Sequence, residues 1–421
     1  MTEPTLGSRP QRLMGLDAYR GFIMLVMASA GFTLAKVATH HPESAPWEML
    51  AYQLDHVPWR GGGFWDLIQP SFMFMVGVAM PFSYADRRAR GQSWSQLFRH
   101  ALGRSLTLIA LGIFLSSAGG KSTQTNFTFV NVLTQIGLGY MVVFLLLGRS
   151  PRVQVGAALA ILAGYWLLFA AYPLPSEGFD LTAMGVPVNG KLLTGFFAHW
   201  EKNANVASAF DVWFLNLFPR PAGDPFRYNE GGYATLNFIP SIATMIFGVL
   251  AGELLRGDRP AIAKLQTLAI VGALCLAGGT LLDATLCPIV KRIWTPSWAI
   301  SSAGWTCWML AFFYGTIDVA GYRRWAFPLV VVGVNSIAMY VMAQLLKPFI
   351  ATTLKIHLGT AWKSLATAPA VDRFVLERTG MHLDPHLFGG LYGPVFQSAA
   401  VLFVLWLVCL WMYRQKIFVK I

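Results

Sequence analysis

Charge is the scarcest property of this sequence. Only 12% of its 421 residues are Asp, Glu, Lys or Arg, whereas 55% are hydrophobic. A soluble domain carries about twice that charged fraction, so the composition excludes an ordinary soluble globular protein. Several apolar runs are roughly 20 residues long, which is the length that a helix needs to cross the hydrocarbon core of a bilayer. The composition therefore predicts an all-α, polytopic membrane protein.

Cysteine is also rare. The four cysteines lie in or beside apolar runs without paired spacing, at Cys275, Cys287, Cys307 and Cys409. This pattern is typical of small core residues and excludes both a disulfide framework and a cysteine metal site. The sequence also lacks a P-loop, metal-ligand spacing and a Gly-x-Ser-x-Gly nucleophile motif. We expect no bound metal.

Positive charge is in excess, with a formal net charge of +12. Such an excess can indicate a nucleic-acid partner, but here the basic residues stand in short loops between apolar runs. That distribution is the one that orients helices in a bilayer. We therefore expect the lipid bilayer, and no nucleic acid, as a partner.

Ten spanning helices are predicted, so both termini lie on one side. With the termini in the cytoplasm, the inner loops and tails hold more than half of the 32 basic residues, as the positive-inside rule requires. Residues 1–18 would form a cytoplasmic tail, and 19–421 a single transmembrane domain with long outer loops at 173–232 and 351–392. The ten helices are expected at 19–38, 65–84, 101–118, 129–147, 154–172, 233–255, 266–285, 298–317, 327–350 and 395–413.

One stretch, residues 52–83, combines reactive side chains with the start of a membrane helix. His56 stands a few residues before the glycines 61–63, and Asp66 and Gln69 follow at the entrance of an apolar run. Histidine is the side chain most easily tuned to exchange a proton near neutral pH. We therefore take His56 as the candidate for chemistry at the outer face of a membrane.

Sequence blocks along nearly the whole chain resemble the heparan-α-glucosaminide N-acetyltransferase family. They are RLMGLDAYRGF, His56-Val-Pro-Trp59, DLIQPSFMFMVGVAM, YATLNFIPSIATMIFGVLAGELL, IWTPSWAISSAG, VVGVNSIAMYV and YRQKIFVKI. The resemblance implies a multi-helix acyltransferase of the cell membrane, here a bacterial inner membrane. Such an enzyme takes acetyl from cytoplasmic acetyl-coenzyme A and delivers it to an amino sugar or other glycan outside. It implies a homodimer as well.

The same resemblance places the catalytic histidine of the family on His56 and its following tryptophan and aspartate on Trp59 and Asp66. Two positions depart from the family pattern. Ala30-Gly31 stands where members often carry Asn, and Thr134-Gln135 stands where they commonly have Gln-Arg. The acceptor and details of donor binding are therefore not transferred from the family.

Each candidate at this stretch has a structural alternative. His56 is either a general base or transient acyl carrier, or a loop histidine satisfied by water. Asp66 either orients His56 or is a carboxylate favoured at a helix start. Trp59 either contacts substrate or anchors the chain at the membrane interface.

Further candidates for binding the substrate or acyl-coenzyme A lie elsewhere in the chain. Asn237, Asn335 and Ser336 would hold the thioester carbonyl or the pantetheine arm, or would hydrogen-bond between helices instead. Arg20 and Arg104 at the inner side would bind the phosphates of coenzyme A, or would serve orientation alone.

Three functions remain open on the residues. The leading one is acetyl transfer across the membrane. The alternatives are a transporter or lipid-linked glycan flippase, in which His56 gates or carries protons, and a receptor or scaffold that leaves His56 and Asp66 unused. Release of free thiol from acetyl-coenzyme A separates the first two.

Overall fold

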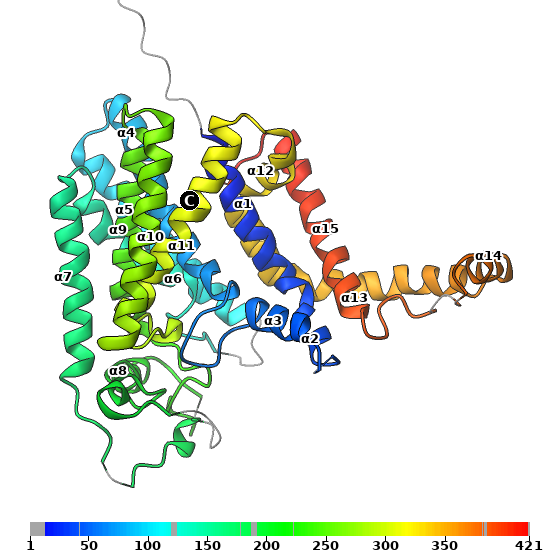
Figure 1. Ribbon diagram of the computed structural model, residues 1–421, viewed down its shortest axis with the longest axis horizontal. Helices are drawn as coiled ribbons and strands as arrows, with labels where there is room; N and C mark the ends of the chain where they lie inside the picture. The colour runs from blue at the N-terminus through cyan, green and yellow to red at the C-terminus, as the bar shows by residue number, and fades with distance from the viewer. Residues whose placement is uncertain are drawn as a thin grey trace, which may run out of the picture.

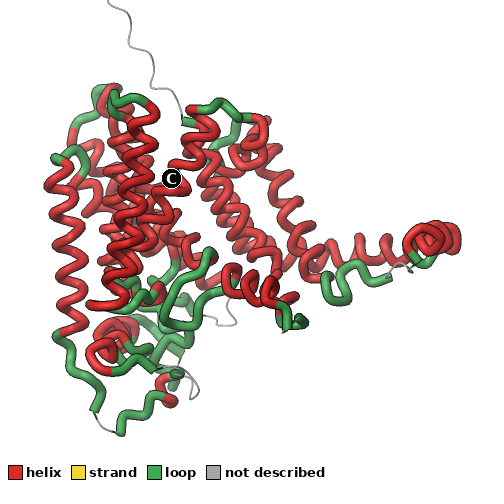
Figure 2. The backbone as a smooth tube through the Cα atoms, viewed as in Figure 1, coloured by secondary structure: helices red, strands yellow, loops and turns green. Residues whose placement is uncertain are grey.

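The computed structural model describes residues 13–41, 43–118, 124–176, 178–186, 192–221, 223–380, 382 and 385–419. Over these residues the regular structure is entirely helical (Figures 1 and 2), apart from one β-bridge between Gly61 and Val290. The predicted all-α fold is confirmed. The predicted tail 1–18 falls mostly on residues 1–12, which lie outside the described part of the chain.

Among the described residues, eight helices are long and apolar enough to cross a membrane. The prediction of ten spans and the orientation of the termini remain predictions. The eight are Met14–Ala38 (α1, Met14–Ser29, with α2, Leu34–Ala38), Trp65–Ala89 (ending in α4, Ile68–Ala89), α5 (Trp94–Ala118), α7 (Pro151–Ala170), Thr235–Arg256 (ending in α9, Phe238–Arg256), α10 (Ala261–Thr285), α13 (Ser336–Ala366) and α15 (Gly393–Arg414). Other helices are α3 (Ala45–Leu54), α6 (Val132–Leu146), α8 (Val206–Leu215), α11 (Pro296–Phe313), α12 (Phe327–Gly333) and α14 (Pro369–Thr379).

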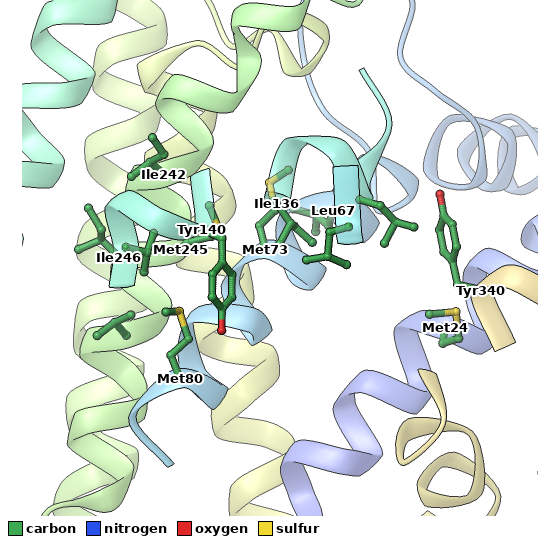
Figure 3. Close-up of a cluster of buried hydrophobic side chains, with 14 of the residues drawn as sticks. Met24, Leu67, Met73, Met80, Ile136, Tyr140, Ile242, Met245, Ile246 and Tyr340 are labelled. Carbon is green, nitrogen blue, oxygen red and sulfur yellow. The ribbon is translucent and has the colours of Figure 1, made fainter. Parts of the chain in front are cut away.

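The centre of the bundle is built by α4 and α9, which approach closely through glycines. A Cβ atom added at Gly77 of α4 would collide with the carbonyl of Met245, and one at Gly248 of α9 would collide with that of Phe74. Around this crossing, buried side chains of α4, α6 and α9 form one apolar cluster (Figure 3), which includes Met73, Met80, Ile136, Tyr140, Ile242 and Met245. The packing fixes the N-terminal ends of α4 and α9 relative to each other.

Helix α6 lies inside the bundle and is unusually short. Its 15 residues begin after Asn131, whose side chain accepts a hydrogen bond from the Thr134 amide as an N-cap. At 1.5 Å per residue the helix is about 22 Å long, less than the ~30 Å hydrocarbon core. The backbone of 124–131 before it is non-helical, and such backbone is tolerated at membrane depth only where it is buried or lines a cavity.

The predicted ninth helix differs from its expected course. The helix expected over 327–350 is divided between α12 and α13, because Asn335 directs its side chain to the C-terminal segment. The α13 helix then continues to Ala366 and runs out sideways toward α14 (Figure 1), so helices occupy much of the expected outer loop 351–392. No proline or paired glycine follows residue 350 to stop the helix until Pro369.

The first helix ends in a left-handed turn. Four successive residues, Ala30 to Thr33, have φ between 50° and 60°, and three of them are not glycine. This turn redirects the chain from α1 into α2 and α3, which lead to His56. The other segment that is predicted to be a long outer loop, 173–232, contains α8, which Asn205 caps by accepting hydrogen bonds from the Ala207 and Ser208 amides.

Candidate active site

His56 and Asp66 form the centre of the site. His56 follows the end of α3, and Asp66 lies in the 3-10 turn that leads into α4. His56 Nδ1 and Asp66 Oδ1 are 2.7 Å apart. The second carboxylate oxygen, Oδ2, accepts hydrogen bonds from the backbone amides of Gly63 at 3.2 Å and Val57 at 3.3 Å. The loop backbone thus holds the buried carboxylate, and the carboxylate holds the imidazole.

This contact decides which nitrogen of His56 can react. A neutral imidazole has one N–H donor and one acceptor nitrogen, and the carboxylate selects the tautomer with hydrogen on Nδ1. The lone pair then lies on Nε2. The His56 side chain is 37% exposed, whereas the Asp66 side chain is 2% exposed. Of the two, only His56 is therefore accessible from outside the protein core. The arrangement is that of a base or nucleophile oriented by a buried carboxylate.

Lys291 completes the cluster from the far side of the sequence. Its Nζ lies 3.7 Å from Asp66 Oδ1 and 3.5 Å from His56 Nδ1, and it donates a hydrogen bond of 3.1 Å to the Tyr233 hydroxyl. Burial lowers the pKa of the Lys291 ammonium to about 8, although the Asp66 carboxylate opposes that shift. Lys291 is therefore mostly charged at neutral pH but close to losing its proton.

The segment between α10 and α11 places Lys291. Gly61, next to the His56 loop, donates its amide to the Ile289 carbonyl at 2.8 Å, which joins the two segments. On the other side of Lys291, Asn237 Nδ2 donates to the Arg292 carbonyl at 2.7 Å. The segment is thus held between the His56 loop and the start of α9.

A cavity of about 270 Å³ adjoins His56. Its polar lining consists of His56, Lys291, Tyr233, Gln69 and Asn131. The rest of the lining comes from α1, the Trp65–Ala89 span, α13 and the residues around Asn131, namely Met27, Trp65, Ile68, Phe72, Val130, Val132 and Tyr340. A mostly apolar cavity with a few convergent polar groups is the usual form of a small-molecule site.

Two of the residues predicted at the outer side have structural partners outside the cavity lining. Trp59 donates its Nε1 hydrogen to the Trp200 carbonyl at 3.1 Å, which ties the His56 loop to the segment 192–221. Asn237 holds the Lys291 segment as described above. These two side chains position the site, and neither lines the cavity.

The polar residues predicted within the ninth helix lie at the division between α12 and α13. Asn335 Nδ2 donates to the Ile417 carbonyl at 2.9 Å, and its Oδ1 accepts from the Val419 amide at 3.0 Å. Ser336 is the first residue of α13. Both polar atoms of the Asn335 amide therefore hold the C-terminal segment, and neither Asn335 nor Ser336 lines the cavity.

The two predicted phosphate-binding arginines are in different surroundings. Arg20 pairs with Asp17 on α1 at 3.4 Å. The Arg104 guanidinium lies over the Tyr140 ring of α6, 5.2 Å from its centroid, and its buried Nε has no hydrogen-bond partner among the described residues. Within the described part of the chain, one buried donor of Arg104 is therefore unsatisfied. Over the same residues, no group of three or more His, Cys, Asp or Glu is arranged to hold a metal ion.

Sequence reasoning did not single out Lys291 and Tyr233. One signal was available for Lys291, since two adjacent basic residues, Lys291 and Arg292, stand in a short segment that the predicted topology places outside. Basic residues are unfavoured in short outer loops, so such a pair indicates a local role. No comparable pattern marks Tyr233.

Comparisons with known proteins identify the same family that the sequence blocks quoted under Sequence analysis resemble. The family model described as heparan-alpha-glucosaminide N-acetyltransferase, catalytic, matches residues 12–283. Human heparan-alpha-glucosaminide N-acetyltransferase is 24% identical over 378 residues, covering 80% of this chain and 53% of the human protein. The mouse protein of the same name is 24% identical over 386 residues, covering 82% and 55%. The chain thus spans about half the length of these curated relatives. His56, Asp66 and Tyr233 lie within the matched region, and Lys291 lies beyond its end.

Proposed function

Because the chain belongs to the heparan-α-glucosaminide N-acetyltransferase catalytic family, we propose that it transfers acetyl from acetyl-coenzyme A to a glycan at the cell membrane. The donor would come from the cytoplasm, and the acceptor would be an amino sugar or hydroxyl on the outer side of a bacterial inner membrane. The observation that carries the proposal is the His56–Asp66 pair at the edge of a mostly apolar cavity.

His56 would act through Nε2. As the acceptor amine or hydroxyl adds to the thioester carbonyl, Nε2 takes its proton, and the tetrahedral intermediate forms. The C–S bond then breaks, and the proton passes to the sulfur of the leaving coenzyme A. In the two-step route, Nε2 attacks the carbonyl first and coenzyme A leaves as the thiolate. The acceptor then attacks the acetyl-imidazole, Nε2 leaves and takes the acceptor's proton, and that proton passes to the thiolate. Asp66 orients the ring and stabilises its positive charge in either route.

The donor would reach His56 along α6. Asn131, at the N-terminal end of this helix, lines the cavity at His56, and Tyr140 lies nine residues further along, under Arg104. Nine residues of helix span about 14 Å. Arginine suits phosphate groups. Of the two predicted arginines, Arg104 is the better candidate for the phosphates of coenzyme A, because Arg20 is already paired with Asp17.

A donor-binding measurement tests this assignment. We expect Arg104→Ala to weaken binding of coenzyme A severalfold while the melting temperature stays near that of the parent. Arg99→Ala, on the same helix, is the matched control for loss of a positive charge. An unchanged dissociation constant for coenzyme A would remove Arg104 from the site and leave the acetyl transfer itself untouched.

The central experiment measures release of free thiol from acetyl-coenzyme A by the purified protein, with glucosamine as the acceptor. We expect His56→Ala to reduce transfer by at least ~100-fold, the lower end for loss of a general base. The change removes little buried surface, so stability should hold. Asp66→Asn should cost less if the carboxylate only orients the ring. His40→Ala, an exposed histidine, is the control. Full activity of His56→Ala would refute the proposal.

Mass spectrometry after mixing with acetyl-coenzyme A alone separates the two routes. A labile acetyl group on His56 supports the two-step route, and its absence favours direct transfer. Transport of a glycan in proteoliposomes without any thiol release would instead support a transporter or flippase.

A further inference from the structure

The hydroxyl of Tyr233 lies next to the reactive pair and has an unused hydrogen. Its oxygen accepts a hydrogen bond from Lys291 Nζ at 3.1 Å, and that same Nζ is 3.5 Å from His56 Nδ1. The Tyr233 ring meets the His56 ring edge-on, with centroids 6.3 Å apart, and both side chains line the cavity. Among the described residues, no acceptor takes the hydrogen of this hydroxyl.

The position of Tyr233 is set by several contacts. Asn229 Oδ1 accepts from the Tyr233 amide at 3.2 Å, and Arg292 donates to the Gly231 carbonyl at 2.7 Å. The Lys291 ammonium and the Arg292 guanidinium lie 4.8 and 5.4 Å from the centroid of the Tyr233 ring. Tyr233 also lies two residues before the span that ends in α9, and α9 packs closely against α4, the helix that follows Asp66. The hydroxyl is therefore placed before any substrate arrives.

The protonation states suit a hydrogen-bond donor. Burial raises the pKa of the Tyr233 hydroxyl to about 12, although the Arg292 guanidinium opposes the shift. The hydroxyl keeps its hydrogen at neutral pH. Lys291, mostly protonated there, donates to the phenol oxygen, and hydrogen bonds that follow one another in this way polarise each other. The remaining O–H is thus a stronger donor than an isolated tyrosine.

We propose that Tyr233 donates this O–H to the carbonyl oxygen of the thioester and stabilises the negative charge that develops there, with Lys291 as the residue that positions and polarises it. The inference rests on the proposed acetyl transfer. No bond to Tyr233 forms or breaks. The acetyl carbon gains its new bond first, which puts the negative charge on the carbonyl oxygen, and the C–S bond then breaks as the carbonyl reforms. In direct transfer the proton follows the route through His56 to sulfur. Fixed donors of this type are among the largest contributions to acyl transfer.

Tyr233→Phe tests the proposal because it removes only the hydroxyl and keeps the ring. We expect the kcat of thiol release to fall by ~100- to 1000-fold, the usual loss for one such donor. KM for acetyl-coenzyme A and the dissociation constant of coenzyme A should stay within about threefold, because the bond strengthens only in the transition state. Tyr228→Phe removes a hydroxyl from the same loop away from the cavity and should behave as the parent protein.

The coupling between the two residues gives a second measurement. If Lys291 acts through the Tyr233 hydroxyl, Lys291→Met should lower kcat less in the Tyr233→Phe background than in the parent protein. Equal losses in both backgrounds would mean that Lys291 does not act through Tyr233.

The outcomes separate this inference from the proposed function. If the parent protein releases thiol and Tyr233→Phe stays within about threefold of Tyr228→Phe, the role of Tyr233 is wrong and acetyl transfer stands. If the parent protein releases no thiol from acetyl-coenzyme A, both fail together. A loss of kcat with a melting temperature within a few degrees of the parent supports the inference.

Discussion

Lys291 is a buried cation that serves two neighbours at once. Its ammonium lies beside the Asp66 carboxylate, which holds His56, and it donates to the Tyr233 hydroxyl. Taking a charge out of water is costly unless partners replace the water, and here a carboxylate and a phenol oxygen do so. The remaining cost appears as the lowered pKa of about 8. The charge on this residue is thus open to control by pH.

Turnover should follow that charge. Below pH 8 Lys291 is mostly protonated, and as the pH rises through about 8 it loses the proton, so that Asp66 and Tyr233 lose a charged partner. We expect kcat to fall above pH 8. Lys291→Arg keeps its charge and should extend activity to higher pH. Lys355→Arg, an exposed lysine on α13, is the control. If kcat falls at the same pH in the parent, Lys291→Arg and Lys355→Arg proteins, the charge of Lys291 is not needed for turnover.

The sequence predicted two of the four polar residues that meet at the candidate site, His56 and Asp66, and missed Lys291 and Tyr233. His56 and Asp66 are ten residues apart on either side of a glycine-rich loop, so their meeting follows from local geometry, and the family resemblance drew attention to both. Lys291 is 235 residues from His56 in sequence. Its arrival depends on how α9, α10 and α11 pack, and a hydrophobicity pattern does not encode that packing.

Among the elements, the glycine crossing of α4 and α9 controls the site most directly. Helix α4 follows Asp66 in the chain and helix α9 follows Tyr233. The separation of these two helices therefore sets the distance between the two side chains. Gly77 leaves no room for a Cβ against the Met245 carbonyl, whereas Gly103 on α5 has open space around it. The two glycines therefore form a matched pair for the same substitution.

Gly77→Ala should lower the melting temperature and reduce acetyl transfer, because overpacking a core of this kind costs about 1–3 kcal/mol and pushes the two helices apart. Gly103→Ala should be neutral or slightly stabilising, since alanine favours a helix over glycine by about 1 kcal/mol. Thermal unfolding in detergent and thiol release measure both effects. Equal stability of the two variants would mean that the crossing is not tightly packed.

The long helices could be predicted because each span needs an apolar run of a fixed length. The division at Asn335 could not, since residues 327–350 read as one apolar run without a helix-breaking pair at that point. A tertiary contact with the C-terminal segment divides the helix instead. The left-handed turn at Ala30 to Thr33 was equally hidden, because three of its four residues rarely adopt that conformation.

At the scale of the whole molecule, the orientation predicted from charge has a direct test. We expect the loop before α5 to face the cytoplasm and the segment after α7 to face outside. Single cysteines at Ser93 and Ser176, both exposed, are introduced after Cys275, the cysteine that is only partly buried, is replaced by Ala. In intact cells an impermeant reagent should label Ser176→Cys and spare Ser93→Cys. The reverse pattern would invert the orientation.

The short α6 bears on how the molecule responds to membrane voltage. Its length of about 22 Å is less than the bilayer core, so a transmembrane potential falls over a shorter path there than through the surrounding lipid. In the proposed transfer the outer acceptor gives up a hydrogen and gains an acetyl group, while coenzyme A loses the acetyl group and gains the hydrogen. Both exchanges are neutral, so no net charge crosses that field. Each 100 mV is worth about 2.3 kcal/mol only for each elementary charge that is moved. An imposed potential in proteoliposomes should therefore leave the equilibrium of the transfer unchanged, even though the hydrogen and the acetyl group exchange across the membrane.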